Sequence, residues 1–154
     1  MQKRDGQMLV QQYGDMLYRI CLCSLRSHAD AEDAVQEVLL RYVTRAPEFD
    51  SEEHRKAWLI RVAVNQCRTM LRRSARSIPT DPQELHPPEQ RREDGRILDA
   101  LMELPEPCRM VLILHYVEGY KTREIARMIG KSESTVKMRL QKGRRLLKAA
   151  FGKE

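Results

Sequence analysis

The stretch YKTREIARMIGKSESTVKMRLQKGRRLLKA, residues 120–149, decides the fold of the last part of this 154-residue chain. Its apolar residues recur at helical spacing and predict two short helices. Gly130 falls between them, where a sharp reversal of the backbone often requires a positive φ. Thr122 and Ser132 are the expected N-caps of the two helices. The stretch therefore predicts a helix-turn-helix whose second helix enters a DNA major groove.

The distribution of charge separates this motif from an ordinary helical hairpin. Residues 119–154 carry eleven Lys/Arg and three Glu, a net charge of +8. Residues 1–118 carry seventeen basic and nineteen acidic residues, a net charge of −2. A DNA phosphate backbone favours such a concentration of positive charge, because binding releases counterions. DNA binding is therefore preferred over the alternative of a purely structural hairpin.

Composition limits the remaining possibilities. Glycine is scarce and aromatic residues make up 5% of the chain, which favours an all-α fold. No apolar run approaches the roughly 20 residues of a membrane helix, and the N-terminus lacks a signal-peptide core, so we expect a cytoplasmic protein without membrane insertion. The cysteines show no CxxC spacing, so reduced thiols in the core are expected rather than a metal site. They are Cys21, Cys23, Cys67 and Cys108.

A proline-rich segment divides the chain. Residues 73–94, RSARSIPTDPQELHPPEQRRED, hold four of the seven prolines and almost no large apolar side chain. Such a segment cannot build a core and predicts an extended linker. The expected organisation is therefore two small helical domains, residues 1–73 and 95–154, joined by a flexible linker at 74–94. No cofactor is expected.

The N-terminal domain predicts three helices, over residues 8–26, 31–45 and 54–73. The second is cleanly amphipathic, with Asp30 as its expected N-cap. Acidic side chains gather around it, since residues 30–53 hold eight acidic and two basic residues. We expect its acidic face to meet one partner and the third helix to meet another.

That third helix carries a basic stripe. Residues 55–76 contain seven basic residues and no acidic one. Like charges along one helix repel each other, so a polyanionic partner explains the stripe better than neutralisation by the acidic helix, which remains the alternative. A second nucleic-acid contact is therefore predicted. The stripe consists of Arg61, Asn65, Arg68, Arg72 and Arg76.

The C-terminal domain begins ahead of its helix-turn-helix with an apolar helix. Pro105 and Pro107 open this helix, CRMVLILHYV, and Gly119 closes it. Its expected core residues are Val111, Leu112 and Leu114, with His115 packed beside them.

These blocks, in this order, resemble the extracytoplasmic-function sigma factors of bacterial RNA polymerase, which are reduced to regions 2 and 4. DAEDAVQEVLLRYV (30–43) is similar to regions 2.1 and 2.2, and HRKAWLIRVAVNQCRTMLRR (54–73) to regions 2.3 and 2.4. LPEPCRMVLILHYVEGYKTREIARMIGKSESTVKMRLQKGRRLLK (104–148) is similar to region 4. The resemblance implies a non-enzymatic factor that binds core RNA polymerase and directs promoter-specific initiation.

The resemblance also implies roles for residues of the first domain. Docking on the β′ clamp helices is implied for Asp33, Gln36, Glu37 and Arg41. Holding the melted −10 element is implied for Arg61, Asn65, Arg68, Arg72 and Arg73. Within that set, Asn65 would form part of a pocket for a flipped base, and the loop before Trp58 would border that pocket.

In the second domain, the recognition helix would lie in the major groove of the −35 element. Further partners implied are the β flap of polymerase and an anti-sigma factor. The N-terminal part of such a helix reaches base edges, and later residues meet the DNA backbone. The expected −35 contacts are Arg127, Lys131, Ser132, Glu133, Ser134, Lys137, Met138, Gln141, Arg144 and Arg145.

Other classes of protein remain as alternatives. A free-standing helix-turn-helix regulator would bind symmetric half-sites as a dimer, but a sensor domain has no need of the basic stripe. An enzyme is disfavoured because the chain has no Gly-rich phosphate loop, HExxH motif or nucleophile elbow. A protein-binding adaptor would leave the positive C-terminal charge unexplained.

Overall fold

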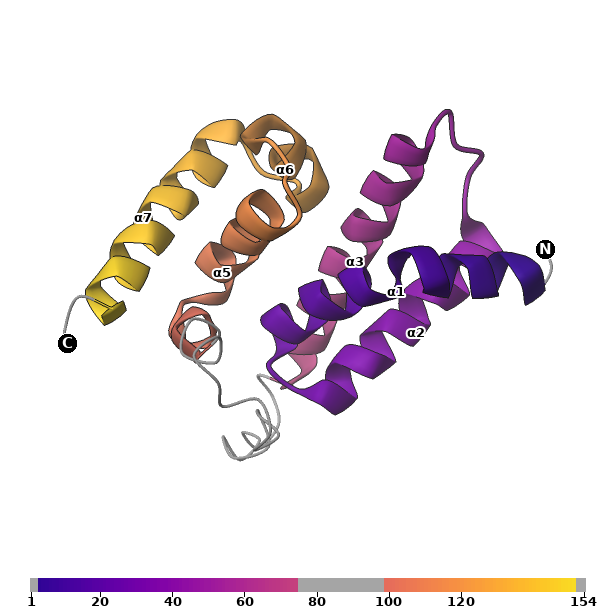
Figure 1. The fold of residues 1–154 in the computed structure, drawn as a ribbon, viewed down its shortest axis with the longest axis horizontal. Coiled ribbons are helices and arrows are strands. Elements are labelled where there is room, and N and C mark those ends of the chain that lie inside the picture. Colours follow the sequence, from indigo (N-terminus) through magenta and orange to yellow (C-terminus); the bar gives the residue numbers. More distant parts are fainter. Residues whose placement is uncertain (1–2, 75–98, 152–154) are drawn as a thin grey trace. The chain divides into compact units, whose positions relative to one another are not determined.

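The computed structural model describes residues 3–74 and 99–151, and every regular element within these ranges is helical (Figure 1). The chain divides into two compact units, Met1–Pro79 and Thr80–Glu154. The predicted all-α class with two helical domains is therefore confirmed. All of the predicted linker at 74–94 except its first residue lies outside the described residues, so the linker and the predicted domain boundaries remain predictions.

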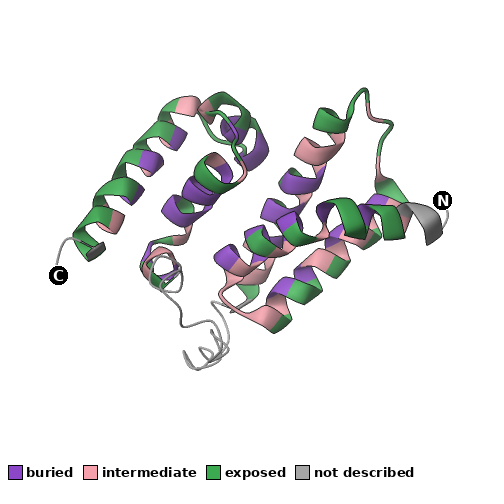
Figure 2. Cartoon of the chain, in the orientation of Figure 1, coloured by how far each residue is buried: buried purple, intermediate pink, exposed green. Residues whose placement is uncertain are grey.

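Unit 1 is a bundle of three helices, α1 (Lys3–Leu25), α2 (His28–Arg45) and α3 (Glu52–Ser74), and each packs against the other two. Figure 2 shows buried residues along these helices. Burying a large apolar side chain contributes about 2 kcal/mol, so this shared core holds the bundle together. Its large, fully buried members are Leu17, Ile20, Val38, Leu59, Ile60 and Val64.

The start of α2 differs from the prediction. The N-cap is Ser27, whose side-chain oxygen accepts the Asp30 N–H over 3.2 Å, and Asp30 lies inside the first turn. Serine and aspartate have nearly equal N-cap preferences, so the sequence pattern does not separate them. Arg26 adopts the left-handed conformation with φ 61°, and this reversal ends α1.

Unit 2 contains a helical segment at residues 99–103, α5 (Glu106–Leu112), the π-helical turn η3 (Ile113–Val117), α6 (Thr122–Ile129) and α7 (Glu133–Phe151). α7 packs against both α5 and α6. The core predicted behind the helix-turn-helix is present. Its buried members include Val111, Leu112, Leu114, Ile125, Val136 and Leu140.

The apolar helix predicted ahead of the helix-turn-helix is not α-helical throughout. The α-helix ends at Leu112, and the Glu118 N–H donates to the Ile113 carbonyl five residues back, over 3.0 Å. A run of apolar residues does not distinguish an α-turn from a π-turn, because apolar side chains are compatible with both. His115, in the π-turn, is half-buried, and its Nδ1–H donates to the Tyr120 carbonyl over 2.7 Å.

α6 and α7 form the predicted helix-turn-helix. Gly130 has φ 69°, and no atom lies within 4 Å of where a Cβ would stand, so the backbone conformation rather than space favours glycine. Ser132 caps α7, since its Oγ accepts a backbone N–H of the first turn over 3.1 Å. The prediction that Thr122 caps α6 is wrong. Lys121 is the cap residue, and Glu124 accepts its N–H over 3.0 Å.

α7 approaches α5 closely at Gly143. A Cβ at this buried glycine would lie 2.9 Å from Leu112 Cδ1, so glycine permits the contact between the helices. Also in α5, buried Arg109 donates to the carbonyls of Met102 and Leu104, each over 3.0 Å. These bonds satisfy carbonyls at the end of the preceding helical segment. The base of the helix-turn-helix is therefore fixed by both packing and hydrogen bonds.

Candidate nucleic-acid interfaces

The outer face of α3 is basic and polar. Its inner face buries Leu59, Ala63 and Cys67 in the unit 1 core. No arginine of the outer face has an ion-pair partner within ranges 3–74 and 99–151, so the positive potential is not neutralised there by the acidic α2. The face holds Arg61, Asn65, Arg72 and Arg73, all exposed, and Arg68, half-buried. Arg76, the last predicted member, lies outside the described residues.

The predicted polymerase-docking residues lie on α2. Asp33 and Gln36 are exposed. Glu37 is partly exposed and pairs with Arg41 at 3.5 Å. Arg41 was expected to point outward, but it also donates to Gln66 Oε1 of α3 over 3.2 Å. Arg41 therefore joins two helices of the unit, and the outward acidic face consists chiefly of Asp33, Gln36 and Glu37.

Phe49 anchors the connection between α2 and α3. Its ring centroid lies between 5.3 and 6.1 Å from the centroids of three other rings, and the Arg55 guanidinium lies 5.3 Å from its centroid. The three rings belong to Tyr42, His54 and Trp58. Each aromatic contact contributes about 1 kcal/mol beyond area burial. The linear pattern did not predict this aromatic cluster, because it joins residues from two helices and a loop.

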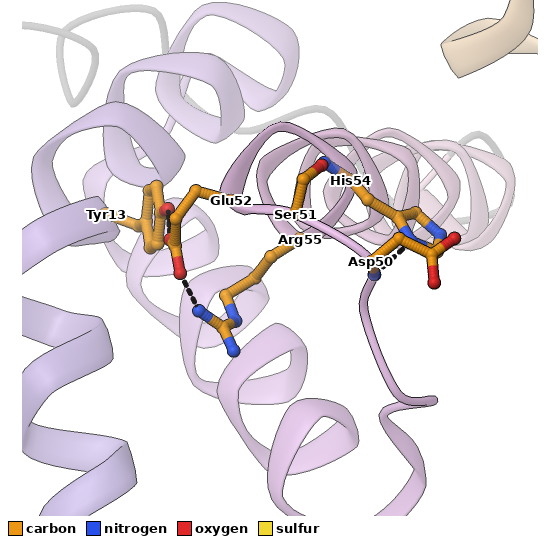
Figure 3. Close-up of polar contacts among 6 residues, drawn as sticks. All are labelled: Tyr13, Asp50, Ser51, Glu52, His54 and Arg55. Atoms are coloured by element: carbon orange, nitrogen blue, oxygen red, sulfur yellow. Dashed lines mark hydrogen bonds and ion pairs between the residues drawn. The ribbon is translucent and has the colours of Figure 1, made fainter.

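Polar contacts tie the same connection to α1 (Figure 3). The Tyr13 hydroxyl donates to Glu52 Oε2 over 2.6 Å, and Glu52 forms an ion pair with Arg55. The Asp50 N–H donates to His54 Nδ1 over 3.2 Å. Burial and the bond to Glu52 raise the pKa of Tyr13 to about 12. The same bond, followed by the Arg55 charge, holds the pKa of Glu52 below its usual 4.5.

α7 buries one side and exposes a polar side (Figure 2). Val136, Leu140 and Gly143 lie on the buried side. The exposed members are spaced so that they share a face along the helix, as predicted for a recognition helix. They are Ser134, Lys137, Met138, Gln141 and Arg145. Two further predicted contacts, Arg127 of α6 and Lys131 of the turn, are exposed.

Glu133, also predicted to contact DNA, is engaged within the protein. The Thr122 hydroxyl donates to Glu133 Oε1 over 2.9 Å, and Lys137 Nζ lies 3.6 Å from the same oxygen. The Thr122 bond, followed by the Lys137 charge, lowers the pKa of the Glu133 carboxyl. The Glu133 carboxylate is therefore shared between Thr122 and Lys137, and Ser132 is occupied as the cap. The sequence pattern missed this relay, because Thr122 and Glu133 belong to different helices.

An apolar groove of about 460 Å³ runs beside α7 in unit 2. Tyr116 and Val117 of the π-turn line it and are 58% and 53% exposed. Arg144 Nε donates to the Tyr116 hydroxyl, and its guanidinium lies 5.5 Å from the ring centroid. Arg144 therefore lies on the groove, and both it and its neighbour Arg145 are exposed. The sequence did not identify this groove.

The four cysteines lie in the core, as predicted, since Cys21, Cys23, Cys67 and Cys108 are all buried. None of the helices that the structure describes is both long and apolar enough to cross a membrane.

An exposed basic helix in one helical unit and a helix-turn-helix in the other define a two-domain DNA-binding protein. Residues 9–77 match the family Sigma-70 region 2, and residues 94–147 match Sigma-70, region 4. The chain belongs to the extracytoplasmic-function (ECF) sigma factors, as the sequence predicted. It therefore directs transcription initiation with RNA polymerase and is not an enzyme.

Two relatives from Mycobacterium tuberculosis show this membership. The chain is 36% identical over 152 residues to the ECF RNA polymerase sigma factor SigL, covering 91% of this chain and 85% of that protein. It is 32% identical over 149 residues to SigM, covering 94% and 76%. Both alignments include the two helical units.

Solved structures agree on the fold. The sigma factor RpoE from Bartonella quintana, crystallised with the anti-sigma factor NepR, has a TM-score of 0.80 at 22% identity, covering 98% of this chain and 99% of that one. CnrH, in complex with the cytosolic domain of CnrY, has a TM-score of 0.70 at 25% identity, covering 98% and 90%.

Proposed function

We propose that the two units divide promoter recognition, with unit 1 opening the −10 element and unit 2 reading the −35 duplex. The observation that carries this proposal is the exposed face of α3, where arginines without ion-pair partners among the described residues surround Asn65. A duplex-binding regulator needs its helix-turn-helix alone. A second basic surface in a separate unit is useful when one protein must hold two parts of a promoter at once.

In unit 1, Arg61, Arg68 and Arg72 hold the phosphates of the displaced strand, and Arg73 extends the same surface. Asn65 stands among them with an amide that both donates and accepts hydrogen bonds, as recognition of an unstacked base requires. Capturing a base outside the stack favours the open duplex by binding energy alone. No hydrolysis is needed for this step.

In unit 2, the exposed face of α7 enters the major groove. Ser134, Lys137, Met138 and Gln141 are its candidate base-reading or nearby phosphate contacts, and Arg145 meets the backbone farther along. The relay through Glu133 supports a defined position for Lys137 before DNA binds. Arg127 and Lys131 are placed to add phosphate contacts beside the recognition helix.

Polymerase docking uses two other surfaces. Asp33, Gln36 and Glu37 of α2 meet the β′ clamp helices, and Arg41 supports Glu37 from the side facing α3. The apolar groove at Tyr116 and Val117 receives the β flap, because an exposed apolar concavity on a small domain favours a protein partner. The same surfaces suit an anti-sigma factor, such as the one with which the sigma factor RpoE from Bartonella quintana was crystallised.

A reconstituted holoenzyme tests the division of labour. Core RNA polymerase with this chain is expected to give discrete run-off transcripts on genomic fragments, which identify the promoters. On such a promoter, Asn65→Ala should spare holoenzyme binding to the closed duplex and reduce opening, measured by permanganate reactivity of unpaired thymines. Equal losses of duplex binding and opening would contradict the role of Asn65.

The docking surface has its own test. Asp33→Asn with Glu37→Gln should weaken core polymerase binding about tenfold, because charge-assisted contacts contribute about 1 kcal/mol or more each. The matched control is Asp15→Asn on α1, an exposed carboxylate outside the proposed face. Unchanged polymerase affinity in the double variant would remove α2 from the interface.

A further inference from the structure

The connection between α2 and α3 is held at several points at once. It runs from Ala46, the C-cap of α2, to Ser51, the residue before α3. Connections of this length on a protein surface are often mobile. Here the side chain of Phe49 turns inward to the aromatic cluster, while Glu48 and Asp50 on either side of it are exposed. The loop therefore has a half-buried aromatic centre and acidic flanks.

Hydrogen bonds between backbone N–H groups and side chains fix the second half of the loop. The Asp50 N–H donates to His54 Nδ1 over 3.2 Å, and the His54 N–H donates to Ser51 Oγ over 3.1 Å. His54 thus contacts the loop through its ring, its backbone and its edge-on stacking against Phe49. These contacts bind the loop to the first turn of α3, but none of them reaches α1.

Tyr13 supplies a hydrogen-bonded link to α1. Tyr13 is 6% exposed, and its hydroxyl reaches Glu52 at the first position of α3 over 2.6 Å. Glu52 in turn pairs with Arg55, whose guanidinium lies over the Phe49 ring. Arg55 Nε is buried without a hydrogen-bond partner among the described residues, so its placement depends on its other contacts, including that with Glu52. Figure 3 shows Tyr13, Glu52 and Arg55 together.

We infer that Tyr13 and Glu52 are positioning residues, which hold Arg55 over Phe49 and thereby keep the α2–α3 loop in one preformed conformation. The loop is then ready before DNA arrives, and ordering it costs no entropy at the moment of promoter opening. The role of the loop in opening rests on the proposed function. We call the contacts that join Tyr13, Glu52, Arg55 and Phe49 the loop clamp. The loop clamp lies within this protein and is measurable without DNA or polymerase.

Trp58 offers a direct probe of the loop clamp. It is the chain's sole tryptophan, and its ring centroid lies 5.7 Å from that of Phe49, so its fluorescence reports on this cluster. Tyr13→Phe removes one hydroxyl and keeps the ring. Tyr18→Phe is the matched control in the same helix, because it removes a comparable hydrogen bond to His28, away from the loop. Glu52→Gln keeps an acceptor for Tyr13 and removes the charge that holds Arg55.

In the full-length chain, Tyr13→Phe should increase the population of open loop about fivefold, the effect of one typical hydrogen bond. Acrylamide quenching of Trp58 should rise, and the amides of residues 49–55 should exchange faster by a similar factor. The quenching and amide exchange of Glu52→Gln should fall between those of Tyr13→Phe and the wild type. Tyr18→Phe should match the wild type at these amides. Unchanged quenching and exchange in both Tyr13→Phe and Glu52→Gln would overturn the inference.

A second measurement connects the loop clamp to opening. On a promoter opened by the wild-type holoenzyme, Tyr13→Phe should slow opening, at unchanged polymerase affinity, by the factor by which the preformed fraction of the loop falls. Normal opening with a loosened loop would overturn the positioning role. A wild-type holoenzyme that opens no promoter would instead refute the proposed function, while the Trp58 measurement would still decide whether the loop clamp exists.

Discussion

The two candidate DNA-binding helices, α3 and α7, hold their charged side chains differently. The arginines on the outer face of α3 have no ion-pair partner within the described parts of the chain, whereas α7 holds Lys137 through Glu133 and Thr122. An unpaired basic face attracts any nearby phosphate and tolerates a variable path of the strand. A side chain held in place suits a duplex of fixed geometry. The contrast indicates that unit 1 attracts the phosphates of a strand, whereas unit 2 aligns a side chain with a DNA duplex.

The largest effect should come from removing the attraction. Replacing Arg61, Arg68 and Arg72 together by alanine should lower the salt slope of holoenzyme binding to single-stranded −10 DNA by about 2, since each phosphate contact contributes about 0.7. Titration at several salt concentrations measures this slope. Arg45→Ala, an exposed arginine at the end of α2, is the control and should leave the slope unchanged. The same slope in the triple variant would remove the contrast between the helices.

A smaller effect is expected from Lys137→Ala. Promoter-specific duplex binding should weaken about tenfold, the usual effect of losing one well-placed DNA contact. Competition between the promoter and random duplex in holoenzyme assays measures the loss. If binding to both duplexes falls equally, Lys137 contributes only non-specific attraction to phosphates. In that case α7 would hold DNA in the same way as α3.

Gly130→Ala tests how far the stability of the helix-turn-helix depends on the backbone conformation of its turn. No neighbouring atom obstructs a methyl group, so the cost comes from the positive φ and should be about 1 kcal/mol of unit 2 stability. Chemical denaturation monitored by circular dichroism measures it. Gly6→Ala on α1, also without neighbours within 4 Å, is the control and should not destabilise the chain. Equal stability in the two variants would show that the turn does not strain an alanine.

The smallest expected effect is a pH dependence at the start of α3. The Tyr13 hydrogen bond holds the pKa of Glu52 below 4.5, so its stabilising contribution is complete above pH 4.5 and is lost as pH falls through the folded value. Trp58 fluorescence should therefore change at a pH below 4.5. Tyr13→Phe should move this transition upward, toward 4.5. An unchanged midpoint in that variant would show that Tyr13 does not lower the pKa of Glu52.

The sequence predicted the helices and their exposed faces well, because these depend on periodicity along one segment. The buried side of α7 and the stripe of α3 follow from spacing alone. Details at helix ends were less predictable, since Ser27 and Asp30 are nearly equivalent caps, and Glu124 replaces Thr122 at the start of α6. The π-turn also left no distinct pattern.

Contacts between helices were beyond the reach of a linear pattern. Arg41 on Gln66 and Thr122 on Glu133 join residues that are 25 and 11 positions apart. Arg144 and Arg145 are neighbours of the same charge, yet Arg144 alone lies against Tyr116. Which basic side chains remain available to DNA is therefore decided by tertiary packing, after the helices themselves are specified.

Each unit contains at least one buried cysteine whose reaction with a thiol reagent would report when that unit opens. Unit 1 contains Cys21, Cys23 and Cys67, and unit 2 contains Cys108. The bond between Cys21 and Cys67, together with burial, raises the pKa of the Cys21 thiol, which keeps it unreactive while the helices stay closed. A thiol-specific reagent followed by mass spectrometry would thus time the opening of each unit separately, in one sample and without any mutation. Two different rates would mean that one half of this protein can unfold while the other remains intact.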